Sequence, residues 1–130
     1  MKRAFISYSR KDLLFVERLA KDLQAAGVEV WYDLSGLDGG TRWGREIQTA
    51  IRDSESFIVV ISPNSVESEW VEKEFLYANS IQRRVVPIVL ETCETPMWFI
   101  NLHFISMEGE NYARNFDLVL RSLAVQPHPP

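Results

Sequence analysis

The segment Phe57-Ile58-Val59-Val60-Ile61 decides the fold, because four of its five consecutive apolar residues are β-branched. A strand that is apolar on both faces is typical of the interior of a parallel sheet with helices on each side. Four further segments are predicted as strands, at residues 4–6, 28–32, 85–90 and 103–105. Pro87, in the fourth predicted strand along the chain, argues mildly against a regular central ladder there.

Helical patterns separate these strands. Ser9 and Asp12 have the Ser-x-x-acid form of a capping box, and apolar residues at helical spacing follow as far as Gly27, the expected C-terminal cap. Further helices are predicted around residues 43–51, from Trp70 to about Ser80, and from about residue 112 to 123. Strands that alternate with helices in this way predict an α/β, flavodoxin-like three-layer fold with a parallel sheet of about five strands.

Composition limits the classes of function. The 130 residues fit one domain, assigned to residues 1–124, and the proline-rich residues 125–130 resemble a linker to a domain that is absent here. A net charge of -4 argues against direct nucleic-acid binding. A single cysteine, Cys93, points to a reducing compartment, and the chain has no apolar run of the roughly 20 residues that span a membrane. We therefore expect a cytoplasmic domain that does not contact the membrane.

In parallel sheets of this kind, ligands bind outside the carboxyl ends of the strands. That rule selects the segment from Ser7 to Arg10, the glycine-containing loop from Asp33 to Thr41, the turn at Ser62 with the helix after it, and the segment after Leu90. The rule selects places for a ligand and assigns no reaction.

Several chemistries are excluded by missing residues. Gly39-Gly40-Thr41 lacks the lysine of a nucleotide-binding P-loop, and no Gly-x-Gly-x-x-Gly follows the first strand. His103 and His128 form no metal cluster with Cys93, so no metal site is predicted, and no Ser-His-Asp set is expected. A phosphoacceptor receiver domain is also excluded, because acidic residues do not follow the first and third strands.

The pentapeptide Trp70-Val71-Glu72-Lys73-Glu74 contains a candidate for catalysis. Trp70 and Glu74 stand at positions i and i+4 of the predicted helix and share one face. A carboxylate beside an indole is poorly solvated, so its charge acts strongly on a bound ligand. The alternative is a core tryptophan next to a solvated glutamate. Glu72, about 200° away around the helix axis, is expected to face solvent.

Three groups of residues, within 5–12, 30–43 and 57–74, resemble the signature motifs of Toll/interleukin-1 receptor (TIR) domains. The segment Phe5-Ile6-Ser7-Tyr8-Ser9 with Asp12 resembles the first box of the family. Val30-Trp31-Tyr32-Asp33, with Leu37-Asp38-Gly39-Gly40 and Trp43, resembles the second box and its BB loop, here residues 33–41. The segment from Phe57 to Pro63, with Ser68, Trp70 and Glu74 after it, resembles the third strand and the helix with the family's catalytic glutamate. The segment Trp31-Tyr32-Asp33 and the Ser-x-Trp-x-x-x-Glu pattern resemble bacterial TIR domains more closely than animal receptor ones.

The resemblance implies one of two functions. TIR domains are either scaffolds that bind other TIR domains or NAD+ nucleosidases that cleave the bond between nicotinamide and ribose. Glu74 matches the catalytic position of the enzymes, Ser9 and Arg10 match positions that line the NAD+ site, and Asp38 matches an acidic loop position that contacts it. Some relatives have a second basic residue where this chain has Ser9.

A single carboxylate suffices for this chemistry. Nicotinamide in NAD+ is cationic and leaves as a neutral ring, so no general acid is required, unlike in ordinary glycosidases. NAD+ is thus a substrate, and no separate cofactor is expected. Trp43 and Trp70 either stack on the substrate or pack in the core, and Arg10 either pairs with a phosphate or is solvated.

Two questions stay open. The product is either ADP-ribose or a cyclic isomer, which in bacteria implies toxicity by NAD+ depletion or anti-phage signalling. A nucleoside deoxyribosyltransferase-like enzyme, with a related sheet and a glutamate nucleophile, is a third hypothesis for the function.

Self-association is a further expectation. In the TIR family the BB loop docks on a neighbouring TIR domain. The run Pro96-Met97-Trp98-Phe99-Ile100 is either a partner surface or buried within its own chain.

Overall fold

The protein has a parallel five-stranded sheet between two helical layers. The computed structural model describes residues 2–32, 41–99 and 103–124, with residues 41–43 as backbone only. The strands β1 (Lys2–Ser7), β2 (Val28–Tyr32), β3 (Ser56–Ile61), β4 (Arg84–Val89) and β5 (Ile105–Ser106) follow the spatial order β2-β1-β3-β4-β5. This is the flavodoxin-like order, and every pairing is parallel. The predicted fold class is therefore confirmed.

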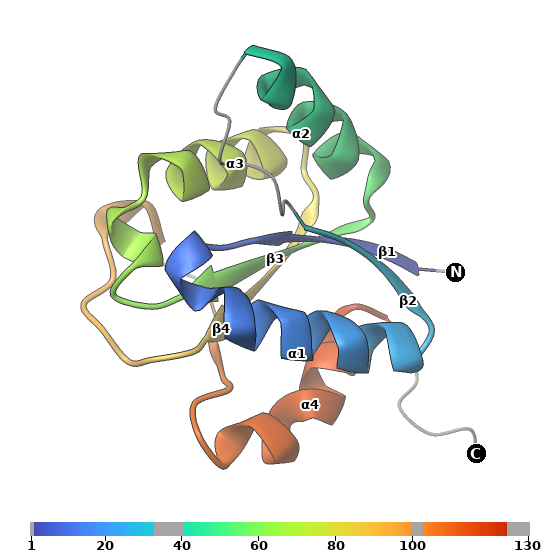
Figure 1. The fold of residues 1–130 in the computed structure, drawn as a ribbon, viewed down its shortest axis with the longest axis vertical. Helices are drawn as coiled ribbons and strands as arrows, with labels where there is room; N and C mark the ends of the chain where they lie inside the picture. Colours follow the sequence, from blue (N-terminus) through green and yellow to red (C-terminus); the bar gives the residue numbers. More distant parts are fainter. Residues whose placement is uncertain (1, 33–40, 100–102, 125–130) are drawn as a thin grey trace.

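Helices cover both faces of the sheet, as Figure 1 shows. On one face, α1 (Leu13–Ala25) and α4 (Asn111–Ser122) pack on Ala4, Ile6 and Ile58. On the other face, α2 (Thr41–Asp53) and α3 (Glu69–Ser80) pack on Phe5 and Phe57. Because successive residues of a strand point to opposite faces, β3 contributes to both cores, and all six of its residues are buried.

The fifth strand differs from its prediction. A strand at residues 103–105 was expected, whereas the observed strand is Ile105–Ser106. Its register is set by β4, because Ile105 pairs with Ile88 and the amide of Met107 donates to the carbonyl of Val89. His103 and Phe104 are exposed and precede the strand, so this boundary was wrong.

Pro87 is accommodated because of where its nitrogen points. The carbonyl of Val89 faces β5 and the amide of Leu90 faces β3, so alternate residues of β4 face alternate neighbours. Pro87 therefore faces the β5 side, where pairing begins only at Ile88. The missing amide proton interrupts no ladder bond that is observed there.

The capping box at Ser9 is only partly as predicted. Ser9 caps the 3-10 turn η1 (Arg10–Asp12) and accepts a hydrogen bond from the amide of Lys11 at 3.4 Å. Asp12 makes no side-chain cap bond to the helix, because its carboxylate turns inward to other partners. Gly27 confirms the other end of α1, with a positive φ of 92° that a residue without Cβ adopts readily.

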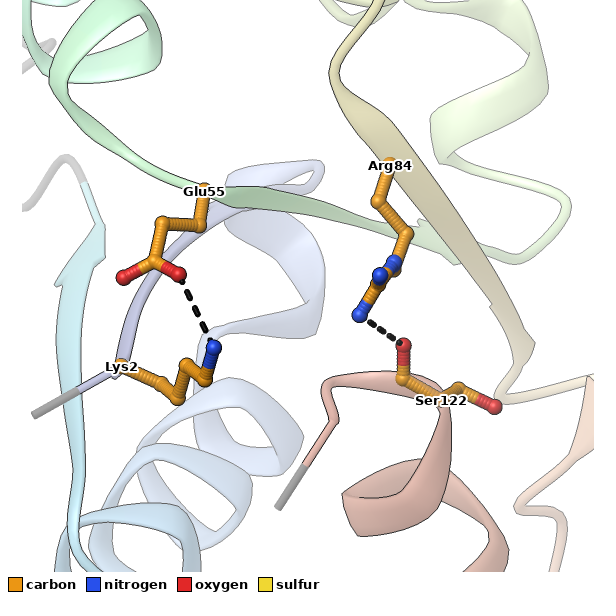
Figure 2. Close-up of polar contacts among 4 residues, drawn as sticks. All are labelled: Lys2, Glu55, Arg84 and Ser122. Carbon is orange, nitrogen blue, oxygen red and sulfur yellow. Dashed lines mark hydrogen bonds and ion pairs between the residues drawn. The ribbon is translucent and has the colours of Figure 1, made fainter.

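Polar contacts join elements at the amino edge of the sheet. Figure 2 shows Lys2 at the start of β1, with its Nζ 3.2 Å from Glu55 Oε2. It also shows Arg84, at the start of β4, donating to the carbonyl of Ser122 at the end of α4 at 3.5 Å. These contacts are exposed, so each contributes little to stability. They lie at the edge opposite to the one where ligands bind in such sheets.

Two sequence predictions fall outside the described residues, namely the conformation of residues 33–40 in the BB loop and the linker at 125–130. Within the described part of the chain, none of the helices is long and apolar enough to cross a membrane.

The aromatic run before residue 100 is mostly internal. The ring of Phe99 is buried and lies 5.1 Å from the ring of Phe75, and the Trp98 ring lies 3.9 Å from that of Phe99. Both rings belong to the 3-10 turn η4 (Met97–Phe99), of which only Met97 is strongly exposed, at 84%. For Trp98 and Phe99, the structure thus favours burial within the chain over a partner surface.

Candidate active site

Buried polar groups lie at the carboxyl edge of the central strands. Ser7 is the last residue of β1, and Ser62 follows the last residue of β3. Because β1 and β3 are hydrogen-bonded parallel neighbours, with Ser7 paired to Val59, the two strand ends lie at the same edge of the sheet. The helix α3 begins shortly after Ser62, so its first turns reach the same edge.

Glu74 points into this edge from α3. Ser68 caps the helix by accepting a hydrogen bond from the amide of Val71 at 3.2 Å. This start places Val71, Phe75 and Ala78 in the core, and Glu74 lies next to them on the buried side. Glu74 is only 7% exposed, which confirms the expectation of a poorly solvated carboxylate.

Ser7 is a partner of Glu74 in β1. Its hydroxyl donates a hydrogen bond to Glu74 Oε1 at 2.6 Å, and Ser7 itself is 1% exposed. Phe5, two residues earlier, packs in the core under α2 and α3, so strand alternation directs Ser7 toward the same helices. The bond joins residues 67 positions apart and links the central sheet to α3.

A second buried carboxylate, Asp12, ties the loop after β1 to the turn after β3. Asp12 Oδ2 accepts from the Ser62 hydroxyl at 2.5 Å, and Oδ1 accepts from the Asn64 side chain at 3.0 Å. Ser62 in turn accepts from the amide of Ser65, the first residue of the 3-10 turn η3 (Ser65–Glu67), at 3.1 Å. Two walls of the edge are held together in this way.

The predicted site residues divide into three groups. Glu74, Ser9 and Arg10 lie on segments that meet at the carboxyl edge, with Ser9 half-buried and Arg10 exposed. Trp70, one turn before Glu74, is 43% exposed and 5.9 Å from Lys73 Nζ, so it is not a core residue. Asp38 and the side chain of Trp43 lie outside the described residues.

Sequence reasoning missed two polar contacts at this edge, the bond from Ser7 to Glu74 and the network of Asp12 with Ser62 and Asn64. The signal for Ser7 was a hydroxyl at an inward-facing position of an otherwise apolar strand, where an unpaired donor is costly. Asp12 was not recognised as a buried residue, because its spacing from Ser9 already predicted a local role in a capping box.

Glu74 lines neither of the two described cavities, of which the second lies at the carboxyl edge, between the turn after β3 and the segment after β4. A cavity of about 510 Å³ between α2 and the strands β1 and β2 is lined by residues of both charges, including Arg3, Arg45 and Asp53. A second, of about 390 Å³, lies beside Cys93. Burial, with a smaller effect of Glu91, raises the pKa of the Cys93 thiol, which disfavours its nucleophilic form. None of the predicted site residues lines either cavity.

Comparison with known proteins identifies the family. A family model described as the TIR domain matches residues 4–120. The chain belongs to the TIR domain family. The TIR fold is also seen in the TIR domain of the Toll-related receptor TRR-2 from Hydra magnipapillata, with a TM-score of 0.81 at 21% identity over 93% of this chain and 97% of that one.

Two microbial relatives have named activities. The chain is 40% identical over 89 residues to NAD(+) hydrolase PdTIR of Paracoccus denitrificans, which is 65% of this chain and 30% of that protein. It is 37% identical over 71 residues to 2' cyclic ADP-D-ribose synthase AbTIR of Acinetobacter baumannii, which is 54% of this chain and 26% of that protein. This TIR domain therefore spans less than a third of either relative.

Proposed function

We propose that this TIR domain cleaves the bond between nicotinamide and ribose in NAD+, with Glu74 as the catalytic residue. The observation that supports this most directly is the buried Glu74 carboxylate at the carboxyl edge of the sheet, held by Ser7 at 2.6 Å. Similarity to an NAD(+) hydrolase and a 2' cyclic ADP-D-ribose synthase favours the same substrate.

The chemistry requires negative charge more than acid catalysis. As the bond breaks, the ring nitrogen of nicotinamide takes the bonding electron pair and becomes neutral, and positive charge develops on the ribose. A carboxylate facing the ribose stabilises that charge, and its effect is strong where water is excluded. No proton has to be delivered to the leaving group.

Other residues bind the substrate in this proposal. Arg10, exposed at the start of η1, pairs with the diphosphate, and Ser9 lies beside it on the same loop. Trp70, with a partly exposed indole, offers a surface for stacking on a ring of the substrate. Asp38 and Trp43 are proposed as further substrate contacts on the resemblance to enzymatic TIR domains.

The product depends on which nucleophile reaches the anomeric carbon. Water gives ADP-ribose, whereas an adenine nitrogen or a ribose hydroxyl gives a cyclic isomer. Relatives of both kinds match this chain. In a bacterium, either product fits cytoplasmic anti-phage defence, by NAD+ depletion or by signalling.

Self-association completes the proposed mode of action. In this proposal the BB loop docks on a neighbouring copy, and a fused sensor or effector domain is a further partner. No direct contact with nucleic acid or membrane is proposed. The alternative function is a non-catalytic scaffold that acts only through contacts between TIR domains.

Product release by the purified domain separates these functions. The protein is incubated with NAD+ and, separately, with deoxynucleosides, and the released bases are resolved by chromatography. We expect nicotinamide from NAD+ and no base from deoxynucleosides. Release of base from deoxynucleosides alone would support the transferase hypothesis, and release of neither would support the scaffold.

The Glu74→Gln variant tests the catalytic residue. Glutamine preserves size and an acceptor oxygen for Ser7 but removes the charge, so kcat should fall by roughly 10³-fold or more. Glu72→Gln on the same helix is the matched control. A Glu74→Gln variant that folds normally and cleaves NAD+ within a few-fold of the wild-type rate contradicts the assignment.

A further inference from the structure

We propose that Ser7 is a positioning residue for catalysis, which sets the orientation of the Glu74 carboxylate through their hydrogen bond. This inference rests on the proposed cleavage of NAD+. It assigns a function to a β1 residue that is too deeply buried, at 1% exposure, to be a surface contact for the substrate.

The place of Ser7 in the sheet makes it a rigid donor. It is the last residue of β1 and pairs with Val59 of the fully buried strand β3. Its neighbours on the same face of the sheet are apolar, among them Phe5 and Val59. A valine at position 7 would continue that apolar face. The hydrogen bond to Glu74 explains why a hydroxyl is present there instead.

The length of the bond indicates a strong interaction. The 2.6 Å between Ser7 Oγ and Glu74 Oε1 falls in the range of about 2.5–2.7 Å expected for a hydroxyl donating to an ionised carboxylate. With Ser7 as the donor, its only proton is committed to Oε1.

The hydrogen bond from Ser7 restricts the orientation of the Glu74 carboxylate. The last side-chain torsion of glutamate, which rotates the carboxylate plane, is broad and has no sharp rotamer. A hydrogen bond from a sheet residue to one oxygen fixes that plane and therefore the direction of the second oxygen. Small errors in the placement of a reacting group reduce the rate by up to about 100-fold. We therefore expect Ser7 to affect kcat rather than substrate affinity.

The test compares three variants with the wild-type domain, in nicotinamide release over a range of NAD+ concentrations. Ser7→Ala removes the donor, Ser7→Thr restores it, and Ser54→Ala is a control. Ser54 is also buried, and its hydroxyl donates at 2.7 Å to the carbonyl of Ala50, near the amino edge of the sheet. The control thus loses a comparable bond away from Glu74.

For Ser7→Ala we expect kcat to fall roughly 10- to 100-fold with KM changed less than about 3-fold. Ser7→Thr should recover most of the loss, and Ser54→Ala should keep wild-type kcat. If Ser7→Ala shows no cooperative transition in a thermal unfolding experiment, Ser7→Cys is used instead. Cysteine has nearly the volume of serine, but its thiol is a weak hydrogen-bond donor.

Three results would overturn the inference while leaving NAD+ cleavage in place. They are a Ser7→Ala kcat within 3-fold of wild type, a change confined to KM, or an equal loss in Ser54→Ala. A wild-type domain that releases no nicotinamide at any protein concentration refutes the proposed function itself. In that case the positioning role is refuted with it.

Discussion

Removing the Asp12 carboxylate should destabilise the whole domain, although Asp12 lies only in the short 3-10 turn η1 that precedes α1. Asp12→Ala deletes two hydrogen bonds, from Ser62 at 2.5 Å and from Asn64 at 3.0 Å. A bond to a charged acceptor contributes about 1.5–3 kcal/mol, and an unpaired buried donor costs about 1–3 kcal/mol. Because both bonds share one carboxylate, their losses overlap, and we expect a total near 3–4 kcal/mol. This is a large part of the roughly 5–15 kcal/mol that stabilises a typical domain.

Urea denaturation followed by far-UV circular dichroism measures this change. Glu17→Ala, an exposed acidic residue on α1, is the control and should stay within about 0.5 kcal/mol of wild type. Ser62→Ala removes one of the two donors and should cost less than Asp12→Ala. In the double variant the two losses should not add, since the Asp12–Ser62 bond is counted in both. An Asp12→Ala variant within 1 kcal/mol of wild type would refute the view that this network holds the edge together.

Three further predictions concern other parts of the chain. Glu72→Gln should leave stability and NAD+ cleavage nearly unchanged, because Glu72 lies about 200° from Glu74 around the axis of α3, although it is half-buried rather than exposed as the sequence predicted; a large loss of activity would contradict this. Specific activity should rise with protein concentration, and Gly39→Trp in the BB loop should remove that rise; activity that stays flat from nanomolar to high micromolar protein would mean that a monomer has a complete site. Tyr112→Phe should lower stability by about 1 kcal/mol, because the Tyr112 hydroxyl donates to Asp22 Oδ2 at 2.5 Å and links α4 to α1. Burial, and then the contact with Asp22, raise the pKa of Tyr112. The wild type should therefore lose stability above pH ~10, where tyrosine ionises in the unfolded chain but not in the folded one. Tyr112→Phe should lose less stability between pH 8 and pH 11, which denaturation at both pH values measures.

The layers of this fold could be predicted because local patterns agree with the tertiary structure. The apolar run of β3 required cover on both faces, and the spacing of Val16, Leu19 and Leu23 required a helix to provide it. The boundary of β5 could not be predicted, because its two residues are placed by pairing with β4 rather than by their own propensity.

At the candidate site, the burial of Glu74 could be predicted from the sequence but its partner could not, for a similar reason. Its helical position next to core residues is a local property, whereas its bond to Ser7 spans 67 positions. Asp12 shows the limit most clearly, since its pattern with Ser9 predicted a local cap. The tertiary structure instead directs the carboxylate to Ser62 and Asn64, where it satisfies two donors rather than one.

The position of the buried carboxylates supports the proposed enzymatic function over a scaffold. Among the residues that the structure describes, the buried carboxylates are Asp12 and Glu74, and both lie at the carboxyl edge. The acidic partner at the amino edge, Glu55, is exposed and paired with Lys2. Burying a carboxylate costs several kcal/mol before its hydrogen bonds are counted, and an apolar residue would fill the same space without that cost. Asp12 offsets the cost by joining two loops. Glu74 is also held, by the Ser7 hydroxyl at 2.6 Å, but it lies on a helix that Val71, Phe75 and Ala78 already fix to the sheet, so the buried charge at that edge supports the proposed catalytic role.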